Sequence, residues 1–286
     1  MSTNVRSLGQ YLSAVKTIRR RWKIPKYFEL WFRSEDTSHR KTHLQPGIYR
    51  QRDSGLRKSV EKLLEIENDL YDEFGRCATQ LSLTDVTIID DEWSSYFLMQ
   101  HHGAPTRLLD WTDGALIALH FAVRDKQMPP KSGSIIYVLD PHWLVKLLKQ
   151  HEDRKDAIER WRRYAEKHRD DVDDDEWERL YLPTDDDERK EPLLNTPETP
   201  LLWDSPHMTR RVAAQRSRFM IFGKDPNWLA KMERKRDSHF VSVTIPKGSI
   251  NKIRQELKDA GITESVVFPD LDGLGRELKQ VWQMRR

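Results

Sequence analysis

The residues best suited to chemistry in this chain lie close together between residues 100 and 112. Two imidazoles and a carboxylate can move protons or stabilise a developing charge, and a guanidinium can hold a phosphate through two parallel hydrogen bonds. Turns that carry polar side chains between buried elements are where sites are usually built. We predict His102, His101 and Asp110 as catalytic residues of this segment. Its predicted substrate- or phosphate-binding residues are Gln100, Thr106, Arg107 and Thr112.

A structural explanation of the same residues stays open. Arg107 and Asp110 are flanked by leucines and a tryptophan, so they could form an internal salt bridge that fastens the turn, with His102 capping a helix. Adjacent histidines on a helix point in different directions, so at most one of His101 and His102 is expected to face a site. No third ligand matches this pair, and we predict no metal site.

The composition excludes several classes of protein. Cys77 is the only cysteine, so an intrachain disulfide and a cysteine-based metal cluster are excluded, which suits the cytoplasm. The N-terminus lacks the apolar region of a secretory signal. The longest apolar run, 115–123, is interrupted by His120 and is shorter than the roughly 20 residues of a membrane span. We therefore expect a cytoplasmic protein without a membrane partner.

Charge is distributed in runs, although the net charge is only +3. Basic runs occur at 19–23 and 160–163, and acidic runs lie within 170–188. Such runs are usually solvated faces. The alternatives are that the acidic 170–188 region binds a protein partner or antitoxin, and that the basic runs contact nucleic acid.

Hydrophobic periodicity predicts the elements that position these residues. Helices are predicted over 7–22, 56–80, 89–102, 113–124, 141–151, 153–168, 249–260 and from about 273. Strands are predicted over 27–33, 134–139, 216–223, 239–245 and 265–268. Gly103 is a good residue to end the helix at 89–102, and Pro105 prevents its continuation.

These elements predict an α+β fold. Strands and helices are mixed without strict alternation and glycine-rich phosphate loops are absent, which disfavours Rossmann and P-loop folds. We expect a mixed sheet packed with several helices. An N-terminal helical segment over 1–26 would precede a single main domain over 27–286, which carries a charged helical and loop insertion at about 152–205.

The string QHHGAPTRLLDWTDGALIALHFA resembles the core signature of the FRG-domain family, which is named for a Phe-Arg-Gly motif. Phe32-Arg33-Ser34 is similar to that motif, with serine at the glycine position. The segments 44–50, 211–219 and 267–274 resemble further stretches of the family in the same order. The resemblance implies a bacterial or phage-associated protein of defence or toxin modules.

The order of motifs is also faintly similar to that of ADP-ribosyltransferases. Arg33 ends an early strand, a threonine-bearing segment precedes the helix at 113–124, and Glu264 or Asp270 supplies a late acidic residue. On this leading hypothesis the substrate is NAD. Arg33 and Arg107 would hold its pyrophosphate, and the late carboxylate would stabilise the oxocarbenium-like centre as nicotinamide leaves.

On the same hypothesis His102 would orient a ribose hydroxyl. Arg211 and Gln215 are further candidate binding residues, although Gln215 could instead hydrogen bond to the central turn. Asp270 could instead cap the helix that follows it.

Two other hypotheses remain. A nucleic-acid-binding protein or nuclease would use His101 or His102 as acid or base, Arg107 as phosphate clamp, and the basic runs with Trp22 and Trp161 as a tracking surface. A non-catalytic interaction module would use Arg107–Asp110 and Arg211–Gln215 as a buried scaffold. A basic stripe that converges on the histidines would favour the nucleic-acid hypothesis, whereas an enclosed pocket would favour the nucleotide-directed enzyme.

Overall fold

A seven-stranded mixed sheet forms the centre of the protein. The computed structural model describes residues 3–51, 57–81, 91–124, 130–168, 173–184, 191–203, 209–235 and 237–284. The strands are β1 (Thr3–Asn4), β2 (Trp31–Asp36), β3 (Leu108–Thr112), β4 (Ser134–Leu139), β5 (Leu201–Trp203), β6 (Ser217–Ile221) and β7 (Phe240–Ile245). Their order is β1-β7-β4-β2-β3-β6-β5. Within the described strands β1 and β7 pair in parallel, and the other neighbouring strands are antiparallel. The predicted α+β class is confirmed.

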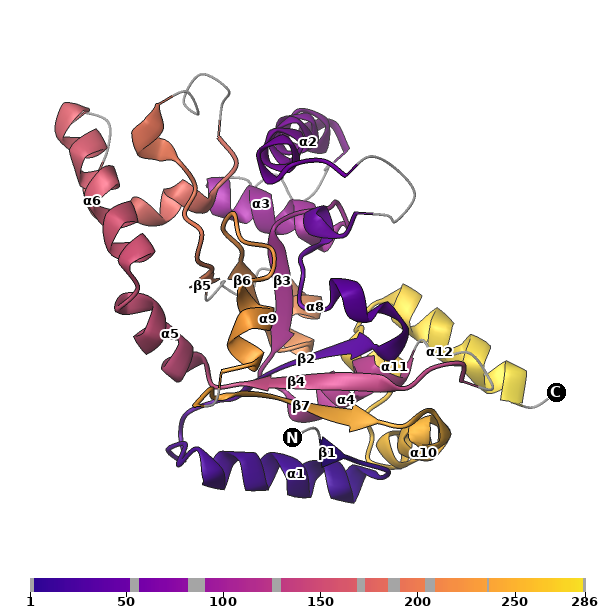
Figure 1. Ribbon diagram of the computed structural model, residues 1–286. Coiled ribbons are helices and arrows are strands. Elements are labelled where there is room, and N and C mark those ends of the chain that lie inside the picture. Colours follow the sequence, from indigo (N-terminus) through magenta and orange to yellow (C-terminus); the bar gives the residue numbers. More distant parts are fainter. Residues whose placement is uncertain are drawn as a thin grey trace.

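The sheet divides into two parts that meet at β2 and β3. β2 pairs with β4 over six positions, whereas its pairing with β3 is limited to Phe32 opposite Thr112. Figure 1 shows β3 and β6 running steeply across β2, β4 and β7. The two strands therefore diverge from this single pair. The side chains along their diverging edges are available to line a site.

Helices cover both parts of the sheet. α1 (Leu8–Arg21), α4 (Ala115–Arg124) and α10 (Ile250–Asp259) pack on the β7-β4-β2 part through a shared apolar cluster that includes Tyr11, Leu119 and Ile253. On its other side lie α5 (Pro141–Lys149), α9 (Trp228–Glu233) and the short helix η2 (Gly47–Tyr49). The N-terminal strand and helix thus share the core of the main sheet.

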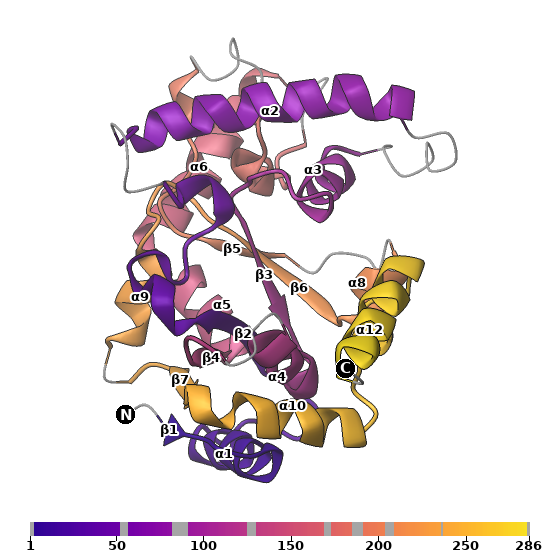
Figure 2. The same cartoon turned by 90° about the vertical axis from the view of Figure 1, so that its right-hand side faces the viewer.

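The β3-β6-β5 part is covered by another set of helices. α2 (Val60–Leu81), α3 (Glu92–His101), α6 (Glu152–Lys167) and η4 (Trp177–Tyr181) form an aromatic-rich cluster with β5 and β6. Figure 2 shows α2 and α3 above this part, and α1 with α10 at the opposite end of the molecule. α8 (Arg210–Ala214), α11 (Glu264–Val267) and α12 (Leu271–Met284) lie beside the point where the two parts of the sheet meet. The remaining short helices are η1 (Thr37–Thr42), η5 (Pro192–Leu194) and η6 (Lys247–Ser249).

A buried ion pair joins the central segment to α2. The guanidinium of Arg107 is 2 % exposed, and its Nε contacts a carboxylate oxygen of Glu67. Glu67 also accepts hydrogen bonds from the Arg107 backbone N–H at 2.6 Å and from the hydroxyl of Tyr96. Arg107 Nη2 donates to the carbonyl oxygen of Tyr181 at 2.6 Å. Burial raises the pKa of Tyr96 well above its usual value, so its hydroxyl stays a donor.

This network corrects two predictions about Arg107. Its guanidinium is enclosed by protein groups, so it is not available as a phosphate clamp. The predicted Arg107–Asp110 ion pair is also wrong, because the partner of Arg107 is Glu67, forty residues earlier. A carboxylate without exposed surface needs a paired cation, and Arg107 supplies it.

Most predicted helices are confirmed, and two strand predictions need correction. Residues 265–268 belong to α11 and its end rather than to a strand, because the Phe268 N–H bonds to the Glu264 carbonyl and closes a helical turn. The strand predicted over 27–33 begins later, at Trp31, and Tyr27 is 92 % exposed.

Two tryptophans proposed as a nucleic-acid tracking surface are buried instead. Trp22 is 8 % exposed and Trp161 is 4 % exposed. Trp22 stacks on His239 with ring centroids 5.1 Å apart, and Trp161 donates to the backbone oxygen of Asp173. Residues 170–172 and 185–188 of the acidic 170–188 region lie outside the described residues. No helix among the described residues is long and apolar enough to cross a membrane.

Candidate functional site

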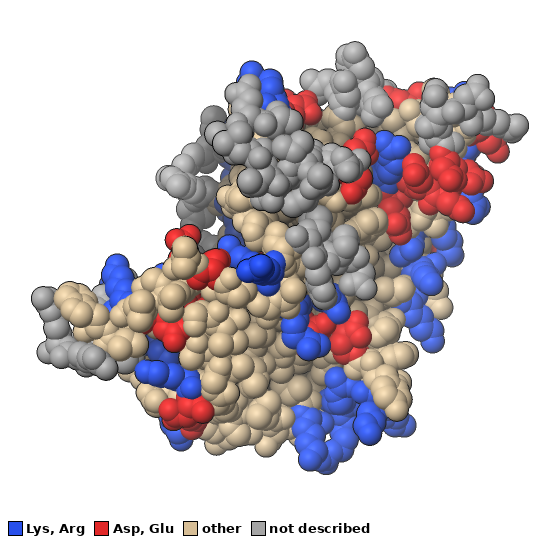
Figure 3. Space-filling view, turned by 180° about the vertical axis from the view of Figure 1, so that it is seen from behind, with Lys and Arg blue, Asp and Glu red and all other residues tan. Residues whose placement is uncertain are grey.

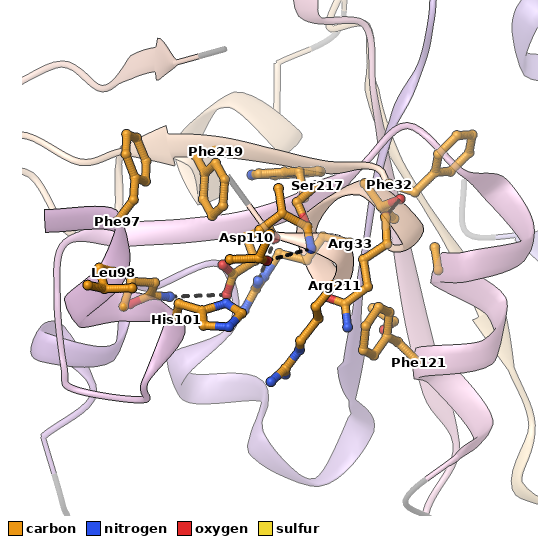
Figure 4. Close-up of a pocket in the computed structure, with 18 residues that line it drawn as sticks. Phe32, Arg33, Phe97, Leu98, His101, Asp110, Phe121, Arg211, Ser217 and Phe219 are labelled. Carbon is orange, nitrogen blue, oxygen red and sulfur yellow. Dashed lines mark hydrogen bonds between the residues drawn. The ribbon is translucent and has the colours of Figure 1, made fainter. Parts of the chain in front are cut away.

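A pocket of about 390 Å³ opens where β2 and β3 diverge. Its walls come from β2, β3, β6, α3, α4 and α8, and include Phe32, Phe97, Phe121 and Phe219. Figure 4 shows His101, Asp110 and Arg211 grouped between Phe97 and Phe219 on one side and Phe121 on the other. Of the predicted site residues, those that line the pocket are Arg33, Gln100, His101, Asp110, Thr112, Arg211 and Gln215.

The chain reversal after α3 places several of these residues side by side. His102 is the C-cap of α3, and Gly103 follows with a φ of +86°, a conformation that favours glycine. The chain then returns as β3, in which Asp110 is exposed between buried neighbours on both sides. The last turn of α3 therefore presents Gln100 and His101 next to Asp110.

A chain of hydrogen bonds fixes the carboxylate of Asp110. Gln100 donates from Nε2 to Asp110 Oδ2 at 3.1 Å. The Gln100 side-chain oxygen accepts from the hydroxyl of Thr106, whose oxygen accepts from the Leu108 N–H at 3.1 Å. Thr106 has no exposed surface. Its predicted role as a substrate-binding residue is therefore replaced by one in positioning Gln100.

Arg33 is also a positioning residue rather than a free cation. Its Nη1 donates to the backbone oxygen of Asp110 at 2.7 Å and ties β2 to β3. Its Nε is paired at 2.8 Å with Glu35, a carboxylate that also pairs with Arg50. Ser34, at the position of the motif glycine, lies in extended β2 opposite Ile136, where no positive φ is required.

His101 faces the pocket, whereas His102 is exposed beside it. The two rings are 5.4 Å apart and perpendicular, as expected for neighbours that point in different directions. Burial lowers the pKa of the His101 imidazole, and the charges of Arg211 and His102 lower it further. His101 is therefore neutral at pH 7 and can accept a proton. Of the two histidines predicted as catalytic, the one that lines the pocket is His101.

Arg211 supplies the unpaired positive charge of the pocket. Over the ranges that the structure describes, its guanidinium has no ion pair or hydrogen bond, and its Cζ lies 4.7 Å from the centroid of the Phe268 ring. Burial lowers the pKa of Arg211, while Asp270 opposes this and Arg124 and Arg276 add to it. An anion in the pocket would offset the desolvation of the Arg211 guanidinium and its repulsion by Arg124 and Arg276.

Thr112 and Gln215 close the far side of the pocket. Thr112 Oγ1 donates to the backbone oxygen of Gln215 at 2.7 Å and accepts from the Gly114 N–H at 3.0 Å. The Gln215 Nε2 is buried and has no partner within the described part of the chain. A buried amide donor without an acceptor is destabilising, so Gln215 is suited to donate to a ligand oxygen.

The two late acidic residues do not line this pocket. Glu264 is buried and contacts Arg124 Nη2 at 2.7 Å, Arg276 Nε at 2.8 Å and His120 Nε2 at 3.2 Å. Burial alone would raise the pKa of Glu264, but pairing with these cations outweighs burial and lowers it. Asp270 Oδ1 accepts from the Gly273 N–H at 2.6 Å at the start of α12, in agreement with the capping interpretation.

Residues 29–131 match the family model described as the FRG domain. The chain carries an FRG domain. The predicted family resemblance is therefore confirmed over these residues. Comparison with curated proteins and with solved structures found no match.

The FRG domain supplies only part of the pocket. Its matched residues include β2, α3, β3 and α4, and so Arg33, Gln100, His101 and Asp110. Arg211 and Gln215 come from the segment after it, together with Phe219. A complete pocket therefore needs both the FRG domain and the chain that follows it.

Sequence reasoning did not identify the aromatic walls of the pocket. Phe97 falls in the helix predicted over 89–102, and Phe219 in the strand predicted over 216–223. Their rings lie 4.8 Å apart at an angle of 48°, with Phe97 3 % exposed. No local signal separates such residues from core residues, because they are core residues that also border a cavity.

Proposed function

We propose that the FRG-domain protein binds a nucleotide in this pocket and transfers ADP-ribose from NAD to an acceptor. One observation carries the proposal: an unpaired guanidinium, a neutral imidazole and a positioned carboxylate, from Arg211, His101 and Asp110, face a single cavity with aromatic walls. Small-molecule sites commonly combine apolar walls with a few convergent polar groups.

The pocket residues provide complementary contacts to a nucleotide. Phe97 and Phe219 offer apolar surface to a planar ring. Arg211 offers two parallel N–H donors to a phosphate. Gln215 offers its buried amide N–H to a carbonyl or hydroxyl oxygen. These contacts would hold the ribose between the rings and the arginine, beside Asp110.

In the transfer step the bond between ribose C1′ and the nicotinamide nitrogen breaks, and its electron pair leaves with nicotinamide. The carboxylate of Asp110 stabilises the positive charge that develops at C1′. A nucleophilic oxygen or nitrogen of the acceptor forms the new bond to C1′, and its proton passes to the neutral imidazole of His101. The Asp110 carboxylate thus takes the role first assigned to Glu264 or Asp270, and Arg211 takes the phosphate-binding role first assigned to Arg33 and Arg107.

The alternative hypotheses have less support. The basic run at 19–23 lies at the end of α1, which Figures 1 and 2 show at the opposite end of the molecule from α3. Figure 3 shows Lys and Arg gathered at the lower right, over that end of α1. This basic surface does not converge on His101. A purely scaffolding role accounts for Arg107 but leaves the unpaired Arg211 unexplained.

The resemblance to the FRG-domain family adds the biological part of the proposal. A transferase of a bacterial or phage defence or toxin module would act on a macromolecule of the cytoplasm. A protein partner or antitoxin would restrain it, and the acidic 170–188 region is the proposed contact.

Calorimetric titration of NAD into the full chain tests the binding part of the proposal. Arg211→Gln is expected to weaken NAD binding by about 10- to 100-fold, because a hydrogen-bonded charge is lost. Arg210→Gln is the matched control, since it removes an exposed arginine next in sequence and outside the pocket. The absence of NAD binding to the wild type, or equal weakening by both variants, would refute the proposed site.

A further inference from the structure

Three guanidinium groups surround one buried phenyl ring beside the pocket. The Cζ atoms of Arg124, Arg211 and Arg276 lie 4.1, 4.7 and 4.9 Å from the centroid of the Phe268 ring. Phe268 is 2 % exposed and contacts Phe121 of the pocket wall edge to face, with ring centroids 5.8 Å apart. This group, which we call the Phe268 cluster, therefore adjoins the pocket directly.

The Phe268 cluster contacts one buried carboxylate, Glu264, and lies near the exposed Asp270 and Asp272. Glu264 pairs with both Arg124 and Arg276, and its contact with Arg276 is to the Nε atom. Within the described residues, the two Nη groups of Arg276 and the whole guanidinium of Arg211 have no hydrogen-bonded partner. Asp270 lies near Arg211, but one of its oxygens caps α12. Unused donors of Arg211, which lines the pocket, and of Arg276 thus remain around Phe268.

Unused donors on two neighbouring arginines match the oxygens of a pyrophosphate. Each guanidinium presents a planar fork that bonds two phosphate oxygens at once. The Cζ atoms of both arginines lie over the Phe268 ring, so a cation–π contact holds each guanidinium at this ring. The repulsion between the cations, which also appears in the lowered pKa of Arg211, would be relieved by a dianion.

We propose that Arg211 and Arg276, seated on Phe268, form the subsite for the pyrophosphate of the nucleotide in the pocket. This inference rests on the proposed function and specifies its substrate class. A dinucleotide or nucleoside diphosphate is bound more tightly than a nucleoside without phosphate. Arg276 is then a specificity-determining residue that belongs to α12, outside the matched FRG domain.

The experiment compares three probes by calorimetry on the full chain at constant ionic strength. The probes are NAD, inorganic pyrophosphate and nicotinamide riboside, which carries no phosphate. Arg276→Gln is expected to weaken NAD and pyrophosphate binding at least about tenfold and to leave nicotinamide riboside binding unchanged. Lys279→Gln removes the same charge from an exposed position of the same helix and is expected to change none of them.

A second readout follows from the position of Arg211. Its charge lowers the pKa of His101, so a bound anion is expected to raise that pKa toward its usual value. NMR titration of the His101 ring with and without pyrophosphate measures this shift. If Arg276→Gln only perturbed folding, it would not selectively abolish the rise in the His101 pKa that pyrophosphate causes.

The outcomes separate the inference from the proposed function. NAD binding that is equal in Arg276→Gln and Lys279→Gln would overturn the pyrophosphate subsite and leave the nucleotide pocket standing. Pyrophosphate binding that depends on Arg276, without any binding of NAD, would overturn both the proposed function and the assignment to a nucleotide. Loss of all three probes in Arg276→Gln would also overturn the subsite, because the effect would not be specific to phosphate.

Discussion

Asp110→Asn is expected to lower the rate of nicotinamide release from NAD by about 100- to 1,000-fold, while the affinity for NAD changes little. Removing a preorganised group that stabilises transition-state charge has an effect of this size. The asparagine oxygen can still accept from Gln100 Nε2, so the hydrogen-bond chain through Thr106 survives and only the negative charge is lost. Single-turnover kinetics at saturating NAD measure the change.

The matched control for Asp110→Asn is Asp69→Asn, which removes one carboxylate from an exposed position of α2. It is expected to retain the wild-type rate. If Asp110→Asn retained that rate as well, Asp110 would have no part in the transfer step. A parallel fall in NAD affinity and rate would instead assign Asp110 to substrate binding.

Arg107→Leu is expected to lower the free energy of unfolding by about 3–5 kcal/mol, because it leaves the carboxylate of Glu67 buried without a cation. The loss includes the hydrogen bond from Arg107 Nη2 to the backbone of Tyr181. Urea unfolding followed by tryptophan fluorescence measures the change. Such a loss is a large fraction of the stability of an ordinary domain.

Two comparisons show whether that loss comes from the buried charge. Arg163→Leu removes the exposed partner of Glu159 in α6 and is expected to change stability by no more than about 0.5 kcal/mol. Adding Glu67→Gln to Arg107→Leu is expected to recover part of the loss, because the amide oxygen still accepts from Tyr96 while the charge is gone. Equal stability of Arg107→Leu and Arg163→Leu would contradict this interpretation of the network.

Local sequence was sufficient to predict the helix ends and apolar segments that build the site. The glycine at 103 and the proline at 105 identified the chain reversal after α3. The apolar run at 115–123 predicted the buried helix α4. These features depend on neighbouring residues alone, through backbone conformation and periodicity.

β3 was not predicted as a strand, because its pattern is not local. Four of its five residues are buried and Asp110 alone is exposed, so the alternation of a half-buried strand is missing. Its pairing partner β6 lies about a hundred residues later in the chain. A strand that depends on pairing with a distant segment cannot be predicted from a short window of sequence.

The sequence indicated the segment that borders the candidate pocket more closely than it indicated the contacts of each residue. Both ends of the segment 100–112 line the pocket, but Arg107 turns inward to Glu67 and Arg33 is paired with Glu35. Arg211 becomes the available cation because α8 folds against the same pocket from a distant part of the chain. Which arginine is paired depends on tertiary contacts, and residue type alone carries no such information.

Incubation of the purified protein with labelled NAD and a cell lysate tests whether the pocket carries out ADP-ribose transfer, by following nicotinamide release and transfer of the label. We predict turnover by the wild type that is lost in Asp110→Asn and Arg211→Gln while both variants stay folded. The labelled product would then identify the acceptor. No turnover by the wild type, together with no change in its melting temperature on addition of NAD, would contradict the assignment of the pocket to NAD.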